Sequence, residues 1–195
     1  MTESATMAFG LIFLAYMLGS IPTAVLVCRA LDLPDPRQRG SGNPGATNVL
    51  RIGSRKAAIL TLLGDISKGL AALAFGKLLQ ISQTELSYCL LAVVAGHIFP
   101  IFSPLKGGKG VATAFGACIA LYWPIALIQL IIWVIAVTIS KISSLASIAA
   151  ALITPVFTWI IAPSHSLLLT TLCLLLLYSH RKNIKKLLNG EEPRL

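Results

Sequence analysis

Long apolar stretches constrain the fold of this chain more than any other feature. A helix that crosses a bilayer needs about 20 apolar residues, and roughly 17 suffice at the short end. Charged residues make up only 12% of the 195 residues, whereas soluble domains carry about a quarter. These properties predict an all-α integral membrane protein with a single polytopic domain over residues 1–195. The apolar stretches lie at residues 8–27, 57–79, 86–102, 111–139, 145–161 and 166–178.

The stretch at residues 111–139 is too long for one comfortable span. Trp123 and Pro124 lie near its middle, and a proline inside a helix removes a backbone donor and favours a break. We therefore divide this stretch into two spans. The division predicts about seven membrane-spanning helices, near residues 8–27, 57–79, 86–102, 111–122, 125–139, 145–161 and 166–178.

Basic residues are distributed unevenly between the apolar stretches. Most of them lie in segments 29–56, 103–110 and 181–194, whereas the N-terminus and residues 80–85 contain none. The positive-inside rule places the three basic segments in the cytoplasm and the N-terminus outside. An outside start and a cytoplasmic C-terminus require an odd number of crossings, which agrees with seven. Lys77 is an exception, because this topology places it on the outer side.

Two of the predicted cytoplasmic segments are rich in glycine. Residues 40–51 read Gly-Ser-Gly-Asn-Pro-Gly-Ala-Thr-Asn-Val-Leu-Arg, and residues 106–110 read Lys-Gly-Gly-Lys-Gly. Glycines allow successive backbone N–H groups to turn toward one anion. A helix that begins near Gly45 would add its own unpaired amides. The third segment, residues 180–191, adds cations, a histidine and an asparagine, so the three segments together predict one pocket for phosphorylated substrates.

Other polar residues leave more than one interpretation open. Cytoplasmic lysines and arginines often serve only membrane topology and contact with anionic headgroups. Asp65 and Lys68 lie three residues apart inside a predicted span, where charged groups form either a structural ion pair or part of a functional site. His97 fits a helix-packing hydrogen bond as well as it fits a catalytic role.

Several classes of site are not expected. Residues 40–45 have the spacing of a dinucleotide fingerprint but lack the strand that must precede it, and Lys109 is followed by glycine where a P-loop has serine or threonine. The cysteines lie inside apolar stretches without metal-ligand spacing, so we expect neither a metal nor a cofactor. The net charge of +9 lies beside the membrane, which favours membrane lipid and phosphorylated small molecules as partners and not nucleic acid.

The segments 40–51, 105–116 and 180–191 resemble the three motifs of the bacterial acyl-phosphate:glycerol-3-phosphate acyltransferases, the PlsY family. The similarity extends through residues 64–69 and 96–100 and reaches Ser143-Ser144, where an aromatic residue expected near the serines is missing. The resemblance implies transfer of a fatty acyl group from acyl phosphate to glycerol 3-phosphate. The expected products are 1-acylglycerol 3-phosphate (lysophosphatidate) and inorganic phosphate, in an early step of phospholipid biosynthesis. It also implies a multi-pass protein of the bacterial cytoplasmic (inner) membrane, with its active site on the cytoplasmic side and an acyl-phosphate-producing enzyme as a candidate partner.

Roles can then be assigned to residues of the three segments as hypotheses. Asn48 or Asn183 would polarise the acyl carbonyl, and His180 or the substrate's own phosphate would act as the base. The expected catalytic residues are Ser41, Asn48, Lys109, His180 and Asn183. The acyl phosphate would be bound by Ser41, Gly42, Asn43, Gly45, Thr47, Gly107 and Gly108. Glycerol 3-phosphate would be bound by Arg51, Lys106, Lys109, Ser143, His180 and Asn183.

A membrane transporter for phosphate esters is the alternative function. Charged residues inside a span and glycine-broken helices would suit transport, but transporters of that kind usually contain two related halves. No internal repeat is visible in the sequence. A non-catalytic lipid-binding protein would not need glycine turns in two separate segments. The acyltransferase interpretation is therefore the one that the sequence favours.

Overall fold

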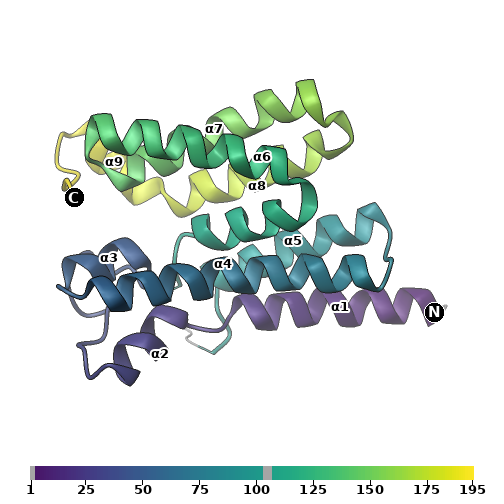
Figure 1. The fold of residues 1–195 in the computed structure, drawn as a ribbon, viewed down its shortest axis with the longest axis horizontal. Helices are drawn as coiled ribbons and strands as arrows, with labels where there is room; N and C mark the ends of the chain where they lie inside the picture. The colour runs from purple at the N-terminus through teal and green to yellow at the C-terminus, as the bar shows by residue number, and fades with distance from the viewer. Residues whose placement is uncertain (1–2, 103–106) are drawn as a thin grey trace. The chain divides into compact units, whose positions relative to one another are not determined.

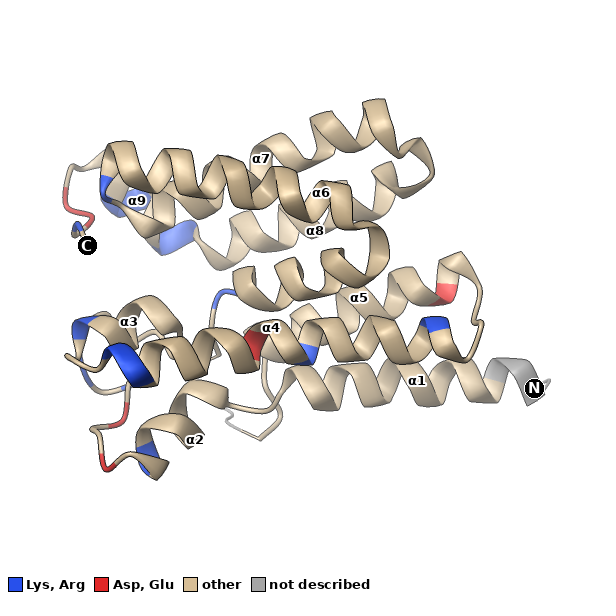
Figure 2. Cartoon of the chain, viewed as in Figure 1, with Lys and Arg blue, Asp and Glu red and all other residues tan. Residues whose placement is uncertain are grey.

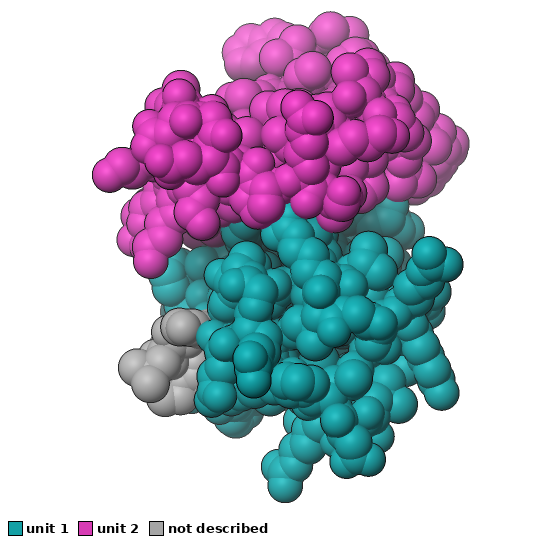
Figure 3. All heavy atoms as spheres, turned by 90° about the vertical axis from the view of Figure 1, so that its left-hand side faces the viewer, with its two compact units in different colours: residues 1–121 teal, residues 122–195 magenta. Residues whose placement is uncertain are grey.

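The computed structural model describes residues 3–102 and 107–195, and all secondary structure in this part of the chain is helical (Figure 1). The chain divides into two compact units, Met1–Leu121 and Tyr122–Leu195, which Figure 3 distinguishes by colour. Three of the described helices are long and apolar enough to cross a membrane, and one bent pair would make a fourth. The all-α prediction is confirmed, while the count of seven spans stays a prediction.

Unit 1 is built around α1, α4 and α5, which pack against one another. α1 and α5 approach closely because a glycine of each faces the backbone of the other. A Cβ added at Gly19 would overlap the carbonyl of Val93, and one added at Gly96 would overlap the carbonyl of Tyr16. Small residues allow this kind of close approach between membrane helices. The helices of unit 1 are α1 (Glu3–Gly19), α2 (Thr23–Ala30), α3 (Ala46–Arg51), α4 (Arg55–Leu78), α5 (Gln83–Ile98) and the first part of α6 (Val111–Ser140).

The first apolar stretch forms two helices where the sequence predicts one. α1 ends at Gly19 and α2 begins at Thr23, with a bend of 42° between them. Pro22 has no backbone N–H to continue the α1 ladder, and the Ser20 hydroxyl donates back to the carbonyl of Tyr16 at 2.9 Å. The carbonyl of Ile21, exposed by the break, accepts a hydrogen bond from Lys68 Nζ at 3.1 Å.

The predicted break in the long apolar stretch is confirmed. Tyr122 interrupts α6 with non-helical dihedral angles (φ −157°, ψ 91°), two residues before Pro124. The carbonyl of Leu121, next to this break, accepts a hydrogen bond from Lys77 Nζ at 3.0 Å. Lys77, which the predicted topology placed on the outer side against the general rule, therefore has a structural partner within unit 1.

We expect Lys77→Met to lower the free energy of unfolding by about 1–3 kcal/mol, the cost of leaving a carbonyl without its donor. Methionine keeps much of the apolar stem but removes the ammonium group. The measurement is thermal unfolding of the purified protein in detergent. Lys56→Met, an exposed lysine on the same helix, is the matched control, and equal melting temperatures for the two variants would contradict this role of Lys77.

Unit 2 contains the remainder of α6 together with two apolar helices and one polar helix. α7 packs against α8, and the last helix, α9, contacts α8. Side-chain hydrogen bonds also join α6 to α7, from Trp133 Nε1 to Ser147 Oγ at 3.1 Å and from Gln129 Nε2 to Thr154 Oγ1 at 3.1 Å. The further elements are α7 (Ser143–Ile161), the short 3-10 helix η1 (Pro163–His165), α8 (Ser166–Ser179) and α9 (Arg181–Leu188).

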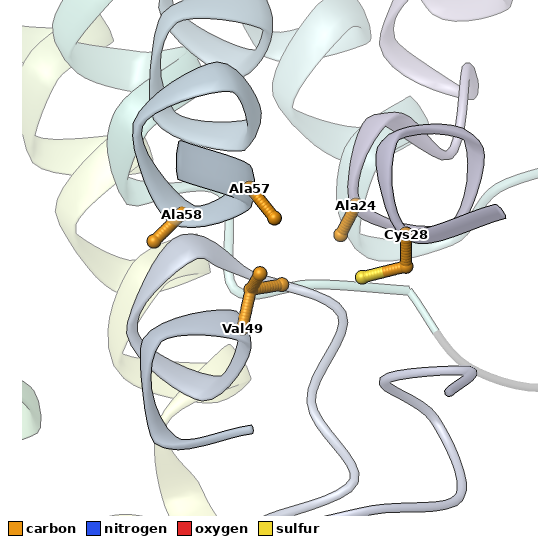
Figure 4. Packing of buried hydrophobic residues seen from close by; sticks show 5 residues of the cluster. All are labelled: Ala24, Cys28, Val49, Ala57 and Ala58. Atoms are coloured by element: carbon orange, nitrogen blue, oxygen red, sulfur yellow. The ribbon is translucent and has the colours of Figure 1, made fainter. Parts of the chain in front are cut away.

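A small apolar cluster fixes α3 against its neighbours in unit 1. Ala24 and Cys28 of α2, Val49 of α3, and Ala57 and Ala58 of α4 are all buried in this cluster. The side chains of Ala24, Cys28, Val49 and Ala57 point toward one another (Figure 4). Short side chains at these positions let the three helices approach closely. The cluster therefore holds the start of α4 and the glycine-rich segment before α3 in a defined place.

Candidate active site

Asn48 organises the first glycine-rich segment. Its side chain is 1% exposed, and its Oδ1 accepts a hydrogen bond from the backbone N–H of Ser41 at 2.8 Å. Its Nδ2 donates to the carbonyls of Pro36 and Arg39 at 2.8 and 3.0 Å. Because both N–H groups of this amide are engaged, none is left for an oxyanion in this conformation. The geometry supports a positioning role for Asn48.

The backbone amides of this segment also bond locally. The amide of Gly42 donates to Arg39 O at 3.0 Å, that of Gly45 to Asn43 O at 2.9 Å, and that of Asn43 to the Ser41 hydroxyl at 3.4 Å. Gly42 has a φ of 70°, which favours glycine. The expected helix start is confirmed, because α3 begins at Ala46 directly after Gly45. The binding of acyl phosphate by Ser41, Gly42, Asn43, Gly45 and Thr47 stays a prediction.

The cations around this segment differ in their surroundings. Arg37 forms an ion pair with Asp35 at 2.6 Å, and its hydrogen bonds to that carboxylate raise the pKa of Arg37. Arg51 is half-buried in the last turn of α3. Figure 2 shows further basic residues at the start of α4. Arg51 is the cation of this segment that is predicted to bind a substrate phosphate, whereas Arg37 is paired with the carboxylate of Asp35.

The second glycine-rich segment rests on the end of α5. The amide of Gly108 donates to the carbonyl of His97 at 3.0 Å, and a Cβ added at Gly108 would overlap Nε2 of the same histidine. Gly107 lies against the carbonyls of His97 and Ile98 in the same way. Lys109 is half-buried and stands two residues before α6, which begins at Val111. Lys106, the other predicted cation of this segment, lies outside the described residues.

A small cavity in unit 1 joins the two glycine-rich segments. Its volume is about 20 Å³, enough for about one water molecule. Pro44 of the first segment contributes to its wall, as do Gly107 and Gly108 of the second. Asp65, Lys68 and His97 line the same cavity. Two of the three predicted segments are thus brought together within one unit.

The third segment lies in unit 2, where its histidine and asparagine have different surroundings. His180 is 2% exposed, and its Nδ1 lies 2.8 Å from the carbonyl of Leu176. A carbonyl only accepts, so Nδ1 carries a hydrogen, and in the neutral ring Nε2 is then the nitrogen that can accept a proton. Asn183 lies three residues further on α9 and donates from Nδ2 to Oε1 of Glu192 at 2.6 Å.

Glu192 is a residue of this site that the sequence prediction missed. Its Oε1 also accepts a hydrogen bond from the Ser144 hydroxyl at 2.6 Å. One carboxylate therefore connects α7, α9 and the C-terminal residues within unit 2. The sequence prediction named Ser143, whose role stays a prediction, and its neighbour Ser144 contacts Glu192, the residue directly after the third segment. The available signal was a pair of acidic residues, Glu191 and Glu192, shortly after a cationic helix that ends at Leu188.

We expect Glu192→Ala to lower the melting temperature and the activity together, because it removes the shared acceptor of Ser144 and Asn183. Hydrogen bonds to charged groups contribute about 1.5–3 kcal/mol each. Glu191→Ala, an exposed neighbour, is the matched control. Detergent-phase unfolding and initial rates report both quantities. If the two alanine variants behaved alike, the connecting role of Glu192 would be refuted.

Comparison with known proteins extends over nearly the whole chain. A family model described as glycerol-3-phosphate acyltransferase matches residues 9–190. A glycerol-3-phosphate acyltransferase of Methylococcus capsulatus is 49% identical over 187 residues, covering 95% of this chain and 94% of that protein. One of Photorhabdus laumondii is 44% identical and covers 98% of this chain and 88% of that protein.

Two solved structures are similar to the fold described above. Both are of PlsY, an integral membrane glycerol 3-phosphate acyltransferase, and they cover 96% of this chain and 95% of theirs. The glycerol 3-phosphate form has a TM-score of 0.90 at 36% identity. The lysophosphatidic acid form has a TM-score of 0.89 at 35% identity.

Proposed function

The chain belongs to the glycerol-3-phosphate acyltransferase family, and from this premise we propose that its acyl donor is an acyl phosphate. It is an integral membrane enzyme that transfers a fatty acyl group to glycerol 3-phosphate and forms 1-acylglycerol 3-phosphate. With acyl phosphate as the donor, the second product is inorganic phosphate. The family assignment favours the enzyme over a transporter for phosphate esters.

One observation carries the proposal about the donor. Two glycine-rich segments, each with a cation nearby in sequence, meet at one small cavity in unit 1, which is lined by Pro44 of the first segment and by Gly107 and Gly108 of the second. Backbone turns of this kind, next to a helix start, suit anions. Glycerol 3-phosphate alone needs one phosphate site, whereas glycerol 3-phosphate together with acyl phosphate needs two. Two such segments therefore fit a donor that carries its own phosphate.

The proposed chemistry requires no protein nucleophile. A hydroxyl of glycerol 3-phosphate attacks the acyl carbonyl, the new C–O ester bond forms, and the bond from the acyl carbon to the phosphate oxygen breaks. The electron pair of that bond leaves with the phosphate. The hydroxyl proton passes to Nε2 of His180 or to the departing phosphate. Acyl phosphate is already activated, so positioning and charge stabilisation supply most of the catalysis.

The roles of the individual residues follow the sequence hypotheses with one change. We assign Asn183 as the donor that stabilises the oxyanion. Asn48 instead holds the first segment, because both N–H groups of the Asn48 amide already donate to backbone carbonyls and its oxygen accepts from Ser41. Lys109 neutralises phosphate charge in unit 1. The acyl phosphate is bound by Ser41, Gly42, Asn43, Gly45, Thr47, Gly107 and Gly108, and glycerol 3-phosphate by Arg51, Lys106, Lys109, Ser143, His180 and Asn183.

We further propose seven spans in the bacterial inner membrane, with the N-terminus outside and the active site on the cytoplasmic side. Within unit 1, α3 and the start of α4 lie at the end opposite the N-terminus of α1, and basic residues gather there (Figures 1 and 2). Positive charge at one end of the helices supports this orientation. The soluble substrate would then reach the glycine-rich segments directly, and an acyl-phosphate-producing enzyme could supply the donor.

The stoichiometry of the reaction tests the proposed chemistry. Purified protein is incubated with palmitoyl phosphate and glycerol 3-phosphate, and inorganic phosphate and lysophosphatidate are measured over time. We expect the two products to form in equal amounts and to require both substrates. Phosphate release without lysophosphatidate would contradict acyl transfer, since it would indicate hydrolysis of the donor.

A further inference from the structure

A network of buried polar side chains lies next to the second glycine-rich segment in unit 1. Lys68 Nζ lies 2.9 Å from Asp65 Oδ1, and that oxygen lies 3.5 Å from His97 Nδ1. The Thr113 hydroxyl lies 3.2 Å from the same ring nitrogen. Asp65, Lys68 and His97 are 3%, 6% and 8% exposed. We call these three residues the buried triad.

Such a cluster is costly to bury. Two charges removed from water lose hydration energy that their mutual attraction often fails to repay, so an ion pair of this kind is weak evidence for added stability. Charged groups inside apolar helices usually face the protein interior and serve a function. None of the three residues belongs to the glycine-rich segments or to the basic third segment. Their arrangement therefore needs a reason beyond stability.

The triad connects two irregular parts of the backbone. At one end, Lys68 Nζ donates to the carbonyl of Ile21, in the break between α1 and α2, at 3.1 Å. At the other end, His97 contacts Gly108 twice, through its carbonyl, which accepts the Gly108 amide at 3.0 Å, and through Nε2, which lies where a Cβ would stand. At Nδ1 the ring lies 3.2 Å from the Thr113 hydroxyl and 3.5 Å from the Asp65 carboxylate. One imidazole ring therefore stands between Asp65 and Gly108.

We propose that the buried triad is a positioning device for the second glycine-rich segment: Asp65 and Lys68 orient His97, and His97 sets the conformation in which Gly107 to Lys109 receive a substrate phosphate. The inference rests on the proposed function, because it assumes that this segment binds phosphate. The three residues line the same small cavity as Gly107 and Gly108, so the device lies directly against the backbone of that segment. Asp65 and Lys68 act only through His97.

The test compares variants that remove the device with variants that preserve part of it. In D65N/K68M both charges are removed together, which avoids leaving one of them unpaired. H97A removes the ring, and H97N keeps a polar group near the position of Nδ1. T113V removes one contact at Nδ1 without changing any charge. The KM values of both substrates and kcat are measured for each variant, together with its melting temperature in detergent.

K77M is the matched control. Lys77 and Lys68 both belong to α4, and each donates to a carbonyl beside a helix break, Leu121 O at 3.0 Å and Ile21 O at 3.1 Å. A purely structural role of the triad would make the D65N/K68M and K77M variants alike. Both would lower the melting temperature and leave the KM values near those of the unmodified enzyme.

We expect H97A and D65N/K68M to raise the KM of at least one phosphate substrate at least about tenfold, whereas K77M should leave both KM values within about threefold of those of the unmodified enzyme. T113V should shift the same KM in the same direction by a smaller factor, and H97N should recover most of the loss caused by H97A. The inference is overturned if these variants leave both KM values near those of the unmodified enzyme and only lower the melting temperature, as K77M does.

The same data separate this inference from the proposed function. If the unmodified enzyme turned over only with a thioester donor, the proposed donor would be wrong, and the KM for glycerol 3-phosphate would still test the triad. If the unmodified enzyme used acyl phosphate and replacement of Lys109 abolished activity, while the triad variants behaved like K77M, only the positioning role would be wrong.

Discussion

Replacement of Lys109 by alanine is expected to lower kcat/KM for acyl transfer by about 10²–10³-fold, the usual loss when one charge-stabilising donor is removed from an active site. Lys109 is half-buried and directly follows Gly108, whose amide and Cα rest on His97. In that setting its ammonium group is poorly replaced by water. The measurement is the initial rate of inorganic phosphate release at several concentrations of each substrate.

Two variants make the expectation for Lys109 specific. Lys109→Arg keeps the charge and should retain more activity than Lys109→Ala, although the planar guanidinium does not reproduce the ammonium geometry. Lys56→Ala removes an exposed cation at the start of α4 and should leave the rate within about twofold, as surface substitutions usually do. If Lys109→Ala also stayed within twofold, the second segment would not be a phosphate site.

Asn48→Ala is expected to lower both stability and activity. It removes three hydrogen bonds, one accepted from Ser41 N–H and two donated to Pro36 O and Arg39 O. A buried group left without its partner costs about 1–3 kcal/mol, so we expect a loss of about 2–4 kcal/mol in the free energy of unfolding. Detergent-phase unfolding and initial rates of the same preparation report the two effects.

The aspartate variant separates the two hydrogen bonds that Asn48 donates from the one that it accepts. Asn48→Asp keeps an oxygen for the amide of Ser41 but directs a carboxylate toward two carbonyls, so it should be no better than Asn48→Ala. Asn189→Ala, an exposed asparagine at the end of α9, serves as the control. Full activity of Asn48→Asp would show that the two donated bonds do not matter for the segment.

The sequence predicted the helical class and the break in α6, because composition and proline act locally. Tyr122 is non-helical, as the Trp123-Pro124 pair indicated. The break between α1 and α2 was not predicted, although Pro22 stands there, since the apolar pattern continues through it. One partner of that break is Lys68, which lies 47 residues further along the chain than Ile21. Spacing within one stretch cannot reveal such a partner.

Within the candidate site, the sequence identified the segments better than the roles of single residues. Glycines and cations marked residues 40–51 and 106–110, and a cavity in unit 1 borders both segments. The function of Asn48 depends on acceptors up to 12 residues away, and that of Glu192 on a serine 48 residues away. These contacts exist only after the helices have packed.

A comparison of acyl donors tests most directly whether the enzyme uses acyl phosphate. Purified protein is offered glycerol 3-phosphate with palmitoyl phosphate, palmitoyl-CoA or palmitoyl acyl carrier protein in parallel, and lysophosphatidate is measured. We predict turnover with palmitoyl phosphate alone, because only in that donor is a phosphate bonded directly to the acyl carbon, where a glycine-rich segment can hold it as the leaving group. Lysophosphatidate formed only from a thioester would show that acyl phosphate is not the donor.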